Sequence, residues 1–302
     1  MSDNVKGFIY IVIATCAFGT MPVLSSIAIE NGGNSTSILL ARFIIVSLFY
    51  IIYMKYRGLS WNVGKKNSIA LIILGFVAYG NVAMLFFLAM KYISPAVGEM
   101  LLYTYPAMVT IGAVFFLKEG FSVKKGLSLL LAFGGCALVL WSPVLKIDFR
   151  GVILAVLTAL FYAIYILGNR KLLDTIHPVV AAAYMAVCCC VYFTLVGVAT
   201  HSLDFHFNLT LIAVVLVFAF WSTIAGMLCF LKGLVLLGAT KASITSTFEP
   251  VFTVVLSYII LHDKVTYIQI IGGALILSSV LLLQEFKKRK KENELEVQRE
   301  VS

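Results

Sequence analysis

Charged residues are scarce in this sequence. Only 12% of its 302 residues are Asp, Glu, Lys or Arg, whereas a soluble domain carries about 25%. Apolar residues make up 61% of the chain, and its mean hydropathy is +1.02. This composition excludes an ordinary water-soluble domain and predicts an integral membrane protein.

The motifs of common enzyme classes are missing as well. No HExxH, GxSxG or phosphate-binding loop occurs in the sequence. All five aspartates lie outside the interiors of the apolar segments, so no pair of aspartates meets within the membrane. Because catalysis needs a nucleophile, an acid and a base that converge, we expect no enzyme activity and no cofactor. The missing phosphate loop also argues against a pump driven by ATP.

Cysteine and histidine form no pattern that is typical of a metal site. The sequence has no CxxC pair, and its six cysteines all fall inside apolar segments, where they act as small apolar side chains. The run of three at 188–190 cannot provide tetrahedral zinc ligation from one helix. The four histidines lie at segment ends or in loops. We therefore expect no metal site.

Long apolar segments dominate what is present. A helix needs about 20 apolar residues to cross a bilayer, and in lipid its backbone groups must be paired within the segment. Ten segments of suitable length predict ten transmembrane helices, at roughly 7–29, 36–54, 68–90, 95–117, 123–141, 151–169, 178–200, 210–236, 239–261 and 266–284.

The sequence repeats itself with a shift of 144 residues. Three marks coincide under this shift: Gly7 with Gly151, Pro106 with Pro250, and Glu119 with Asp263. Each half holds an odd number of segments, so the two copies must be inverted relative to each other. We expect an all-α membrane protein of two inverted five-helix repeats around a central cavity, an arrangement typical of alternating access. The expected parts are 1–146, 147–286 and a basic, polar cytoplasmic tail, 287–302.

Basic residues predict the orientation. With the N-terminus inside, 16 Lys and Arg lie on the cytoplasmic side and 4 on the other. We therefore expect a multi-pass protein of the cell membrane with both termini cytoplasmic. The formal net charge of +9 then reflects topology and does not indicate nucleic-acid binding. The basic tail either binds anionic lipid or, more simply, acts as a topology signal.

Few ionisable residues fall inside the predicted spans, where a charge costs about 2.5–3.5 kcal/mol or more. Arg42 either binds an anionic substrate group or reaches the interface or a neighbouring helix end. Glu99 lies one turn into its span. We expect it to be a solvated residue at the outer rim, and the alternative is a role in charge coupling. Lys232 and Lys241 flank a short turn and are interpreted as interfacial.

Glu249 lies near the predicted midplane, directly before Pro250. Proline leaves the carbonyl of Ser246 without its helical donor, so kinks are expected at Pro250 and at its counterpart Pro106. Glu249 either binds a proton or substrate, or it satisfies the opened helix; the two roles are compatible. The first half has Tyr105 at the matching position, so the halves differ in the carboxylate.

Aromatic residues, 13% of the chain, form a second signal. Tyr50 and Trp61 are interpreted as parts of interfacial belts. Others fall in mid-span, where Tyr and Trp need a polar partner. Such rings either surround a planar or amphiphilic solute or face lipid and neighbouring helices; the mid-span set includes Phe18, Tyr79, Tyr103, Tyr162, Trp221 and Phe248.

These features together resemble the EamA-type branch of the drug/metabolite transporter superfamily. The resemblance rests on the ten spans, Phe248-Glu249-Pro250, the acidic Glu119 and Asp263, and the Gly-Gly helices, and it covers 7–284. It implies transport of small metabolites, often outward, including amino acids and amphipathic compounds. It also implies a central cavity, which on this chain would be lined by Phe18, Tyr79, Tyr103, Tyr162, Trp221, Phe248 and Glu249. Tyr105, and Ser128 opposite Gly272, depart from a symmetric pattern.

Two classes of function remain open at this point. The first is a secondary transporter, with Glu249, Arg42 and Glu99 as candidates for proton or charge coupling. The alternative is a non-transporting membrane scaffold or receptor, which should carry its interaction surface in loops or tails. The short loops and the unusual residues inside the spans favour the transporter, for which a monomer suffices. The substrate and the direction of transport are not encoded in these features.

Overall fold

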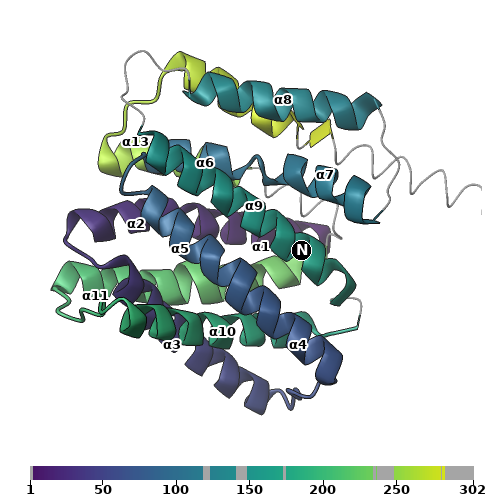
Figure 1. The fold of residues 1–302 in the computed structure, drawn as a ribbon, viewed down its shortest axis with the longest axis vertical. Coiled ribbons are helices and arrows are strands. Elements are labelled where there is room, and N and C mark those ends of the chain that lie inside the picture. The colour runs from purple at the N-terminus through teal and green to yellow at the C-terminus, as the bar shows by residue number, and fades with distance from the viewer. Residues whose placement is uncertain are drawn as a thin grey trace, which may run out of the picture.

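A computed structural model describes residues 3–117, 123–140, 148–172, 175–233, 236, 248–279 and 281–282 (Figure 1). These residues form helices and connecting loops, with no strand among them. The helices are α1 (Asp3–Gly19), α2 (Met21–Glu30), α3 (Ser35–Tyr56), α4 (Lys65–Ile73), η1 (Leu74–Tyr79), α5 (Gly80–Ala89), α6 (Pro95–Leu102), α7 (Tyr105–Leu117), α8 (Val123–Leu140), α9 (Phe149–Leu172), α10 (Pro178–Ala199), α11 (Leu209–Leu216), η2 (Val217–Ala225) and α13 (Glu249–Leu261). A further helix, Tyr267–Ser279, follows.

Six helical stretches among the described residues are long and apolar enough to cross a membrane. They are Val5–Glu30, Ser35–Tyr56, Lys65–Ala89, Phe149–Gly168, Pro178–Ala199 and Leu209–Gly233. Three shorter apolar helices, Gly126–Val139, Glu249–Leu261 and Tyr267–Ser279, fall within other predicted spans. The all-helical, multi-pass membrane fold is thus confirmed, while the count of ten spans and their inversion stay predictions.

The span predicted at 95–117 is interrupted. Helix α6 ends at Leu102 and α7 begins at Tyr105, so the structure has a break where the sequence predicted a kink. Pro106 has no N–H to donate to the carbonyl of Leu102, which removes the bond that would have continued the helix. Thr104 closes the gap, because its N–H donates to the carbonyl of Leu101 and its carbonyl accepts from Ala107.

Two π-helical segments lie at matching places in the two halves. Segment η1 covers Leu74–Tyr79, and a shift of 144 residues places it on 218–223, inside η2. The sequence analysis did not anticipate either segment. A π-helical turn widens the helix and frees backbone groups, and such turns are frequent at functional sites.

The first helix of each half packs into the other half. Helices α1 and α2 contact η2 and α13, whereas α9 contacts η1, α5, α6 and α7. Helices α3 and α10, which the repeat also equates, lie side by side in the lower part of Figure 1. The central part of the molecule is therefore built from both halves.

Glycines let α8 and the last helix approach closely at the upper edge of Figure 1. A Cβ atom on Gly135 would lie 2.5 Å from the carbonyl oxygen of Gly272, and one on Gly272 would lie 2.6 Å from that of Gly135. Ser128, a departure from the repeat, donates a hydrogen bond of 2.8 Å to the carbonyl of Ser279. The two helices are thus in backbone contact and are joined by a hydrogen bond.

Asp263 lies just beyond α13 and ties it to the start of α6. The Ser257 hydroxyl donates to its carboxylate, and Ser94, the N-cap of α6, does so as well. Partial burial raises the pKa of Asp263, and these two hydroxyl groups oppose that change. Its repeat counterpart Glu119 lies outside the described residues.

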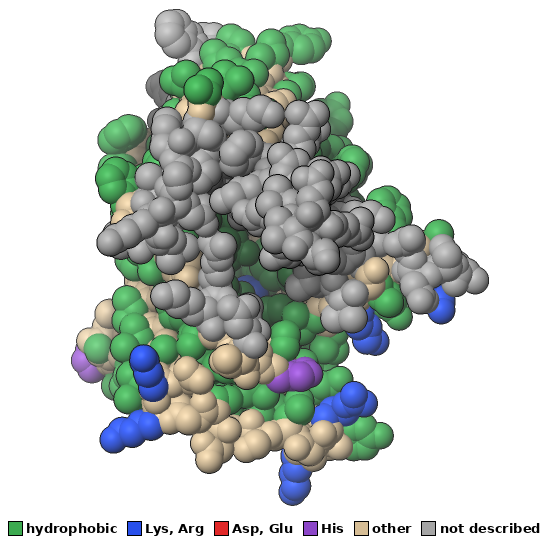
Figure 2. Space-filling view, turned by 90° about the vertical axis from the view of Figure 1, so that its right-hand side faces the viewer, with side chains coloured by type: hydrophobic (Ala, Val, Ile, Leu, Met, Phe, Trp, Pro, Cys, Tyr) green, Lys and Arg blue, Asp and Glu red, His purple; other side chains and the backbone are tan. Residues whose placement is uncertain are grey.

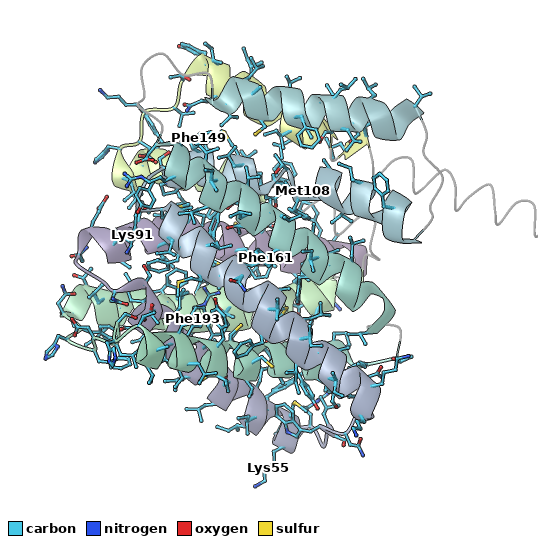
Figure 3. All side chains as sticks on the ribbon, in the orientation of Figure 1. Lys55, Lys91, Met108, Phe149, Phe161 and Phe193 are labelled. Atoms are coloured by element: carbon cyan, nitrogen blue, oxygen red, sulfur yellow. The ribbon has the colours of Figure 1, made fainter. Side chains whose placement is uncertain are left out.

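The described surface is mostly apolar. In Figure 2 hydrophobic side chains cover much of the described upper part of this face, and most Lys and Arg side chains gather toward its lower end. Figure 3 places Lys55 at the lower edge and Lys91 at the left edge of the molecule. Large apolar side chains such as Phe115 (76% exposed) and Phe149 (70%) point outward, as expected where lipid is the solvent.

Candidate functional site

Tyr103 and Glu249 connect the two halves inside the molecule. Tyr103 follows α6 directly and is 5% exposed, and its hydroxyl donates a hydrogen bond of 2.9 Å to Oε2 of Glu249. Glu249 is the first residue of α13, and Pro250 comes next, where a missing N–H costs nothing. The bond therefore joins the break in one half to a helix start in the other.

The end of α1 lies against the same region. A Cβ on Gly19 would stand 3.2 Å from the carbonyl oxygen of Glu249, and Thr253 of α13 donates a bond of 3.0 Å to the carbonyl of Gly19. The next residue, Thr20, separates α1 from α2, and its hydroxyl lies 2.8 Å from that of Ser222 in η2. The ends of α1 and α6, the start of α13 and the π-helical segment η2 thus come together here.

Glu99 is a buried carboxylate beside the half-buried Glu249. It lies one helical turn before Tyr103 in α6, so both side chains share one face. Glu99 is 2% exposed, it interacts electrostatically with Glu249, and its Oε1 has no hydrogen-bond partner among the described residues. The expectation of a wet rim residue is therefore wrong. Depth along the helix was a poor guide, because α2, α8, α9 and α13 enclose α6 laterally.

A row of tyrosine rings leads away from this carboxylate pair. Ring centroids lie 5.8 Å apart for Tyr103 and Tyr105, and 4.7 Å apart for Tyr105 and Tyr162. The row continues through Tyr165, 6.0 Å from Tyr162, to Tyr79, 5.0 Å further. Such spacings are favourable for aromatic pairs. The rings come from the α6–α7 region, α9 and η1, so the row passes from the first half into the second and back.

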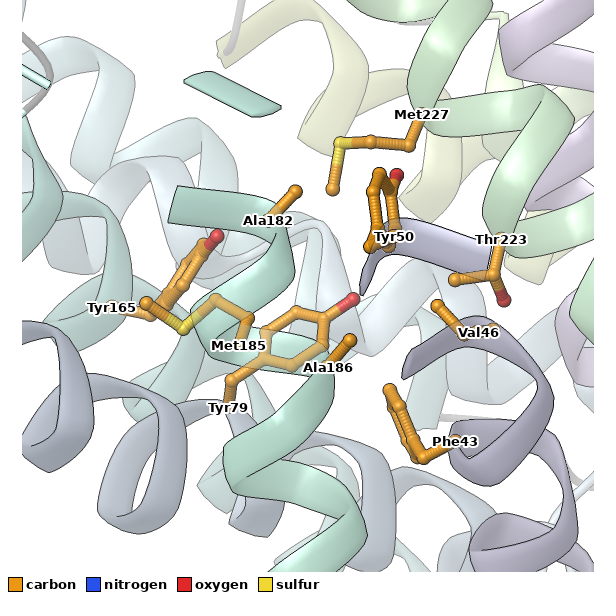
Figure 4. Close-up of a pocket in the computed structure, with 10 residues that line it drawn as sticks. All are labelled: Phe43, Val46, Tyr50, Tyr79, Tyr165, Ala182, Met185, Ala186, Thr223 and Met227. Atoms are coloured by element: carbon orange, nitrogen blue, oxygen red, sulfur yellow. The ribbon is translucent and has the colours of Figure 1, made fainter. Parts of the chain in front are cut away.

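A small pocket lies at the Tyr79 end of the row (Figure 4). Its empty volume is about 280 Å³, open space at the mouth included. In Figure 4 the hydroxyl end of Tyr79 is directed toward the ring of Tyr50. The Tyr50 hydroxyl is buried without a hydrogen-bond partner among the described residues. The lining residues are Phe43, Val46, Tyr50, Tyr79, Tyr165, Ala182, Met185, Ala186, Thr223 and Met227.

Arg42 lies next to this pocket and is 5% exposed. Its Nε donates a bond of 2.9 Å to the hydroxyl of Thr223, a pocket residue, and its Nη2 lies 3.7 Å from Sδ of Met21. The guanidinium also stands over the ring of Phe218, with Cζ 4.8 Å from the centroid. Arg42 is therefore enclosed by the protein, and no described carboxylate forms an ion pair with it.

The remaining aromatic residues that the sequence singled out lie elsewhere. Phe18 is half-buried, with its ring 6.3 Å from that of Phe230 and close to Gly226. Trp221 is 40% exposed and Phe248 61% exposed, and neither lines the pocket. The structure thus brings Tyr79, Tyr103, Tyr162 and Glu249 into one path and leaves these three outside it.

Some predicted features cannot be placed. Lys241 and Ser246 lie outside the described residues, and of Pro106 only the backbone is described. Lys232 is exposed with its Nζ 5.5 Å from the ring centroid of Tyr10, as suits an interfacial residue.

Sequence reasoning misplaced Tyr50 and overlooked Thr223. Tyr50 was assigned to an interfacial belt, but it is 1% exposed because α10 and η2 pack over α3. The Thr223 hydroxyl accepts from Arg42 and itself donates a bond of 2.7 Å to the carbonyl of Phe218. Phe218 lies five residues earlier, which is the spacing of the π-helical segment η2. The position of Thr223 under the repeat, opposite Tyr79, was the one available signal.

Two segments of this chain, 5–141 and 149–284, match the EamA-like transporter family. The chain belongs to this family. The two matches begin 144 residues apart, the spacing of the sequence repeat. The family and its curated relatives indicate a membrane transporter and not an enzyme.

The EamA-like relatives of this chain include two proteins of Bacillus subtilis (strain 168). The "Uncharacterized transporter YyaM" is 26% identical over 243 residues, covering 78% of this chain and 79% of its own. The "Uncharacterized transporter YcbK" is 23% identical over 308 residues, covering 96% and 97%. A protein of known crystal structure, 15% identical, superposes with a TM-score of 0.67 and covers 94% of this chain and 98% of its own, so the two share the fold.

Proposed function

We propose that this EamA-like transporter is a secondary transporter that moves a small amphipathic or aromatic, amino-acid-like metabolite by alternating access. In this proposal ten spans form two inverted five-helix halves in the cell membrane, with both termini cytoplasmic. The halves rock around a central path, which runs from Glu249 and Tyr103 along the row of tyrosine rings to Tyr79. Transport runs outward. Coupling is to protons, with Glu249 as the proton-binding group and Glu99 beside it.

The hydrogen bond between Tyr103 and Glu249 is the observation that carries this proposal. It joins the break between α6 and α7 in one half to the start of α13 in the other, and transporters of this kind bind substrate and coupling ions at discontinuous helices near the midplane. A rocking motion between the halves would make and break such a bond. Protonation of Glu249 would change its ability to accept from the Tyr103 hydroxyl, which links proton binding to the motion.

The path beyond this bond suits an aromatic or amphipathic solute. Tyrosine rings offer flat apolar faces together with hydroxyl groups that form hydrogen bonds. Tyr105, Tyr162 and Tyr165 supply these faces in succession between the carboxylate pair and the pocket. A solute passing along them would replace ring–ring contacts with equivalent ones.

The test is flux through proteoliposomes that contain the purified full-length protein. Efflux of radiolabelled aromatic amino acids and aromatic amines is followed with and without a pH gradient. We expect at least one probe to leave faster than from empty vesicles, and Tyr103→Phe to slow it at least fivefold. Tyr258→Phe, at a 65% exposed position of α13, is the matched control and should not change the rate.

Saturable binding of a probe without flux in any gradient would contradict the proposal. That outcome would favour a receptor. A flux that survives Tyr103→Phe unchanged would contradict the assigned path.

A further inference from the structure

We propose that Arg42 and the pocket beside it form a binding site for the carboxylate group of a singly charged aromatic or amphipathic acid. This proposal rests on the proposed function, because it names the substrate class that enters the central path. The other groups of the path, Glu249 and the tyrosine row, do not supply a positive charge. Arg42 is the group that selects an anion.

Arg42 has no charged partner among the described residues. A buried guanidinium is costly unless a partner compensates for it, and a fixed anion is the usual partner. Among the described residues its contacts are a hydroxyl, a thioether sulfur and aromatic rings, all of them neutral. These neutral contacts hold the Arg42 side chain in place but do not neutralise its charge. The positive charge therefore remains available to a bound anion.

The guanidinium of Arg42 is held in a fixed orientation. Thr223 accepts from Nε, and the Thr223 hydroxyl is itself fixed by its bond to the carbonyl of Phe218 in η2. Two aromatic rings, those of Phe43 and Phe218, hold the guanidinium between them at 5.1 and 4.8 Å. A guanidinium fixed in this way presents its remaining N–H groups in the fork that matches a carboxylate.

The pocket also contains a buried hydroxyl group that no described residue uses as a hydrogen-bond partner. Tyr50 is 1% exposed and its hydroxyl has no hydrogen-bond partner in the described part of the chain. An unsatisfied buried hydroxyl destabilises a protein, so natural sites retain one only where something else is gained. Tyr79 also lines this space, and its hydroxyl end is directed toward the ring of Tyr50 (Figure 4). Both phenols can donate to a carboxylate oxygen.

The pocket chemistry favours one negative charge and an apolar body. A single cation balances one carboxylate, whereas a phosphate dianion would leave a second charge in an apolar surrounding. The walls around the polar groups are the rings of Phe43 and Tyr165 and the side chains of Met185 and Met227. In this proposal the carboxylate group of the solute occupies the narrow pocket. The apolar part of the solute contacts the pocket walls and the tyrosine row.

The test measures binding to the purified, detergent-solubilised full chain by isothermal titration calorimetry. The probes are phenylacetate, its neutral counterpart phenylacetamide and the cation phenethylamine, which share one ring and differ in the head group. We expect phenylacetate to bind at least tenfold more tightly than the other two. Arg42→Gln should remove this preference by weakening phenylacetate alone, at least tenfold, and Tyr50→Phe should weaken it severalfold.

Arg150→Gln is the control, because Arg150 is an exposed arginine paired with Asp148 at 2.7 Å. It should leave all three affinities unchanged. Equal affinity for the three probes, no binding of phenylacetate, or an Arg42→Gln variant that keeps the preference would each overturn the proposal. If Arg42→Gln does not fold, the wild-type preference together with Tyr50→Phe decides: a preference that Tyr50→Phe reduces supports the site, and one that it leaves intact overturns it.

Failure of this site and failure of transport are distinguishable. Arg42-dependent binding of phenylacetate without flux in proteoliposomes would keep the anion site and contradict the transport proposal. Flux of an aromatic amine that is insensitive to Arg42→Gln, with no phenylacetate binding, would keep transport and overturn the anion site.

Discussion

Tyr105 and Glu249 occupy matching positions of the two halves, and each is the first residue of a helix, α7 and α13 respectively. Tyr103 lies between them, with its ring 5.8 Å from that of Tyr105 and its hydroxyl 2.9 Å from Glu249. The repeat thus places an aromatic phenol on one side of the centre and a carboxylate on the other. In the proposed mechanism, this asymmetry places the proton-binding group on one side only.

Glu249→Gln should remove the pH dependence of transport while preserving folding. Glutamine keeps the shape and still accepts from the Tyr103 hydroxyl, but it cannot bind and release a proton. The measurement is the initial efflux rate in proteoliposomes from pH 5.5 to 8.5. A pH profile identical to that of wild type would leave Glu249 with a structural role only.

Glu99 and Glu249 should act as a pair. Because the two carboxyl groups interact electrostatically inside the protein, the effects of Glu99→Gln and Glu249→Gln on the free energy of unfolding should be non-additive, by about 0.5–3 kcal/mol. A double-mutant cycle on thermal unfolding in detergent measures this. The cycle of Glu249→Gln with Glu30→Gln, an exposed position, should be additive. Additivity in both cycles would show that the carboxyl groups of Glu99 and Glu249 are independent.

Gly135→Ala should destabilise the protein by about 1–3 kcal/mol, because its Cβ would collide with the backbone of Gly272 at 2.5 Å. Gly134→Ala is the neighbouring control. It meets nothing within 4 Å and should be neutral or stabilise the helix by up to about 1 kcal/mol. Thermal unfolding of the two variants checks the crossing of α8 and the last helix. Equal stabilities would show that these helices do not cross at Gly135.

The orientation can be tested with single cysteines in a background without the six native ones. Ser60→Cys and Arg150→Cys are both exposed, and the basic-residue asymmetry places the first inside and the second outside. An impermeant maleimide added to intact cells should label Arg150→Cys and reach Ser60→Cys only after the membrane is opened. The reverse pattern would invert the topology.

Hydrophobicity and the repeat predicted much of the fold. The family matches start at residues 5 and 149, in agreement with the repeat found through Pro106 and Pro250. Long apolar runs give helices because lipid leaves the backbone no other partner. The two π-helical segments were missed, since their cause is packing between halves and not a local sequence signal: Gly75, inside η1, lies against Cys188 of α10.

The candidate site was predicted in part. Glu249, Tyr103 and Tyr79 stood out because polar and aromatic groups are rare at mid-span. Glu99 was misjudged because burial depends on which helices surround a side chain, and a single segment does not contain that information. Tyr50 was misplaced for the same reason: its position near a span end suggested an interface, but α10 covers it.

Two-sided access to Tyr105 tests the central claim most directly and needs no substrate. Tyr105→Cys, in the cysteine-free background, is exposed to an impermeant thiol reagent from one side of the membrane at a time. Alternating access predicts that the reagent modifies this position from either side, whereas Phe115→Cys, which faces outward at 76% exposure, is modified from neither. Modification of Tyr105→Cys from one side only, under every gradient applied, would contradict an alternating path through the centre of the protein.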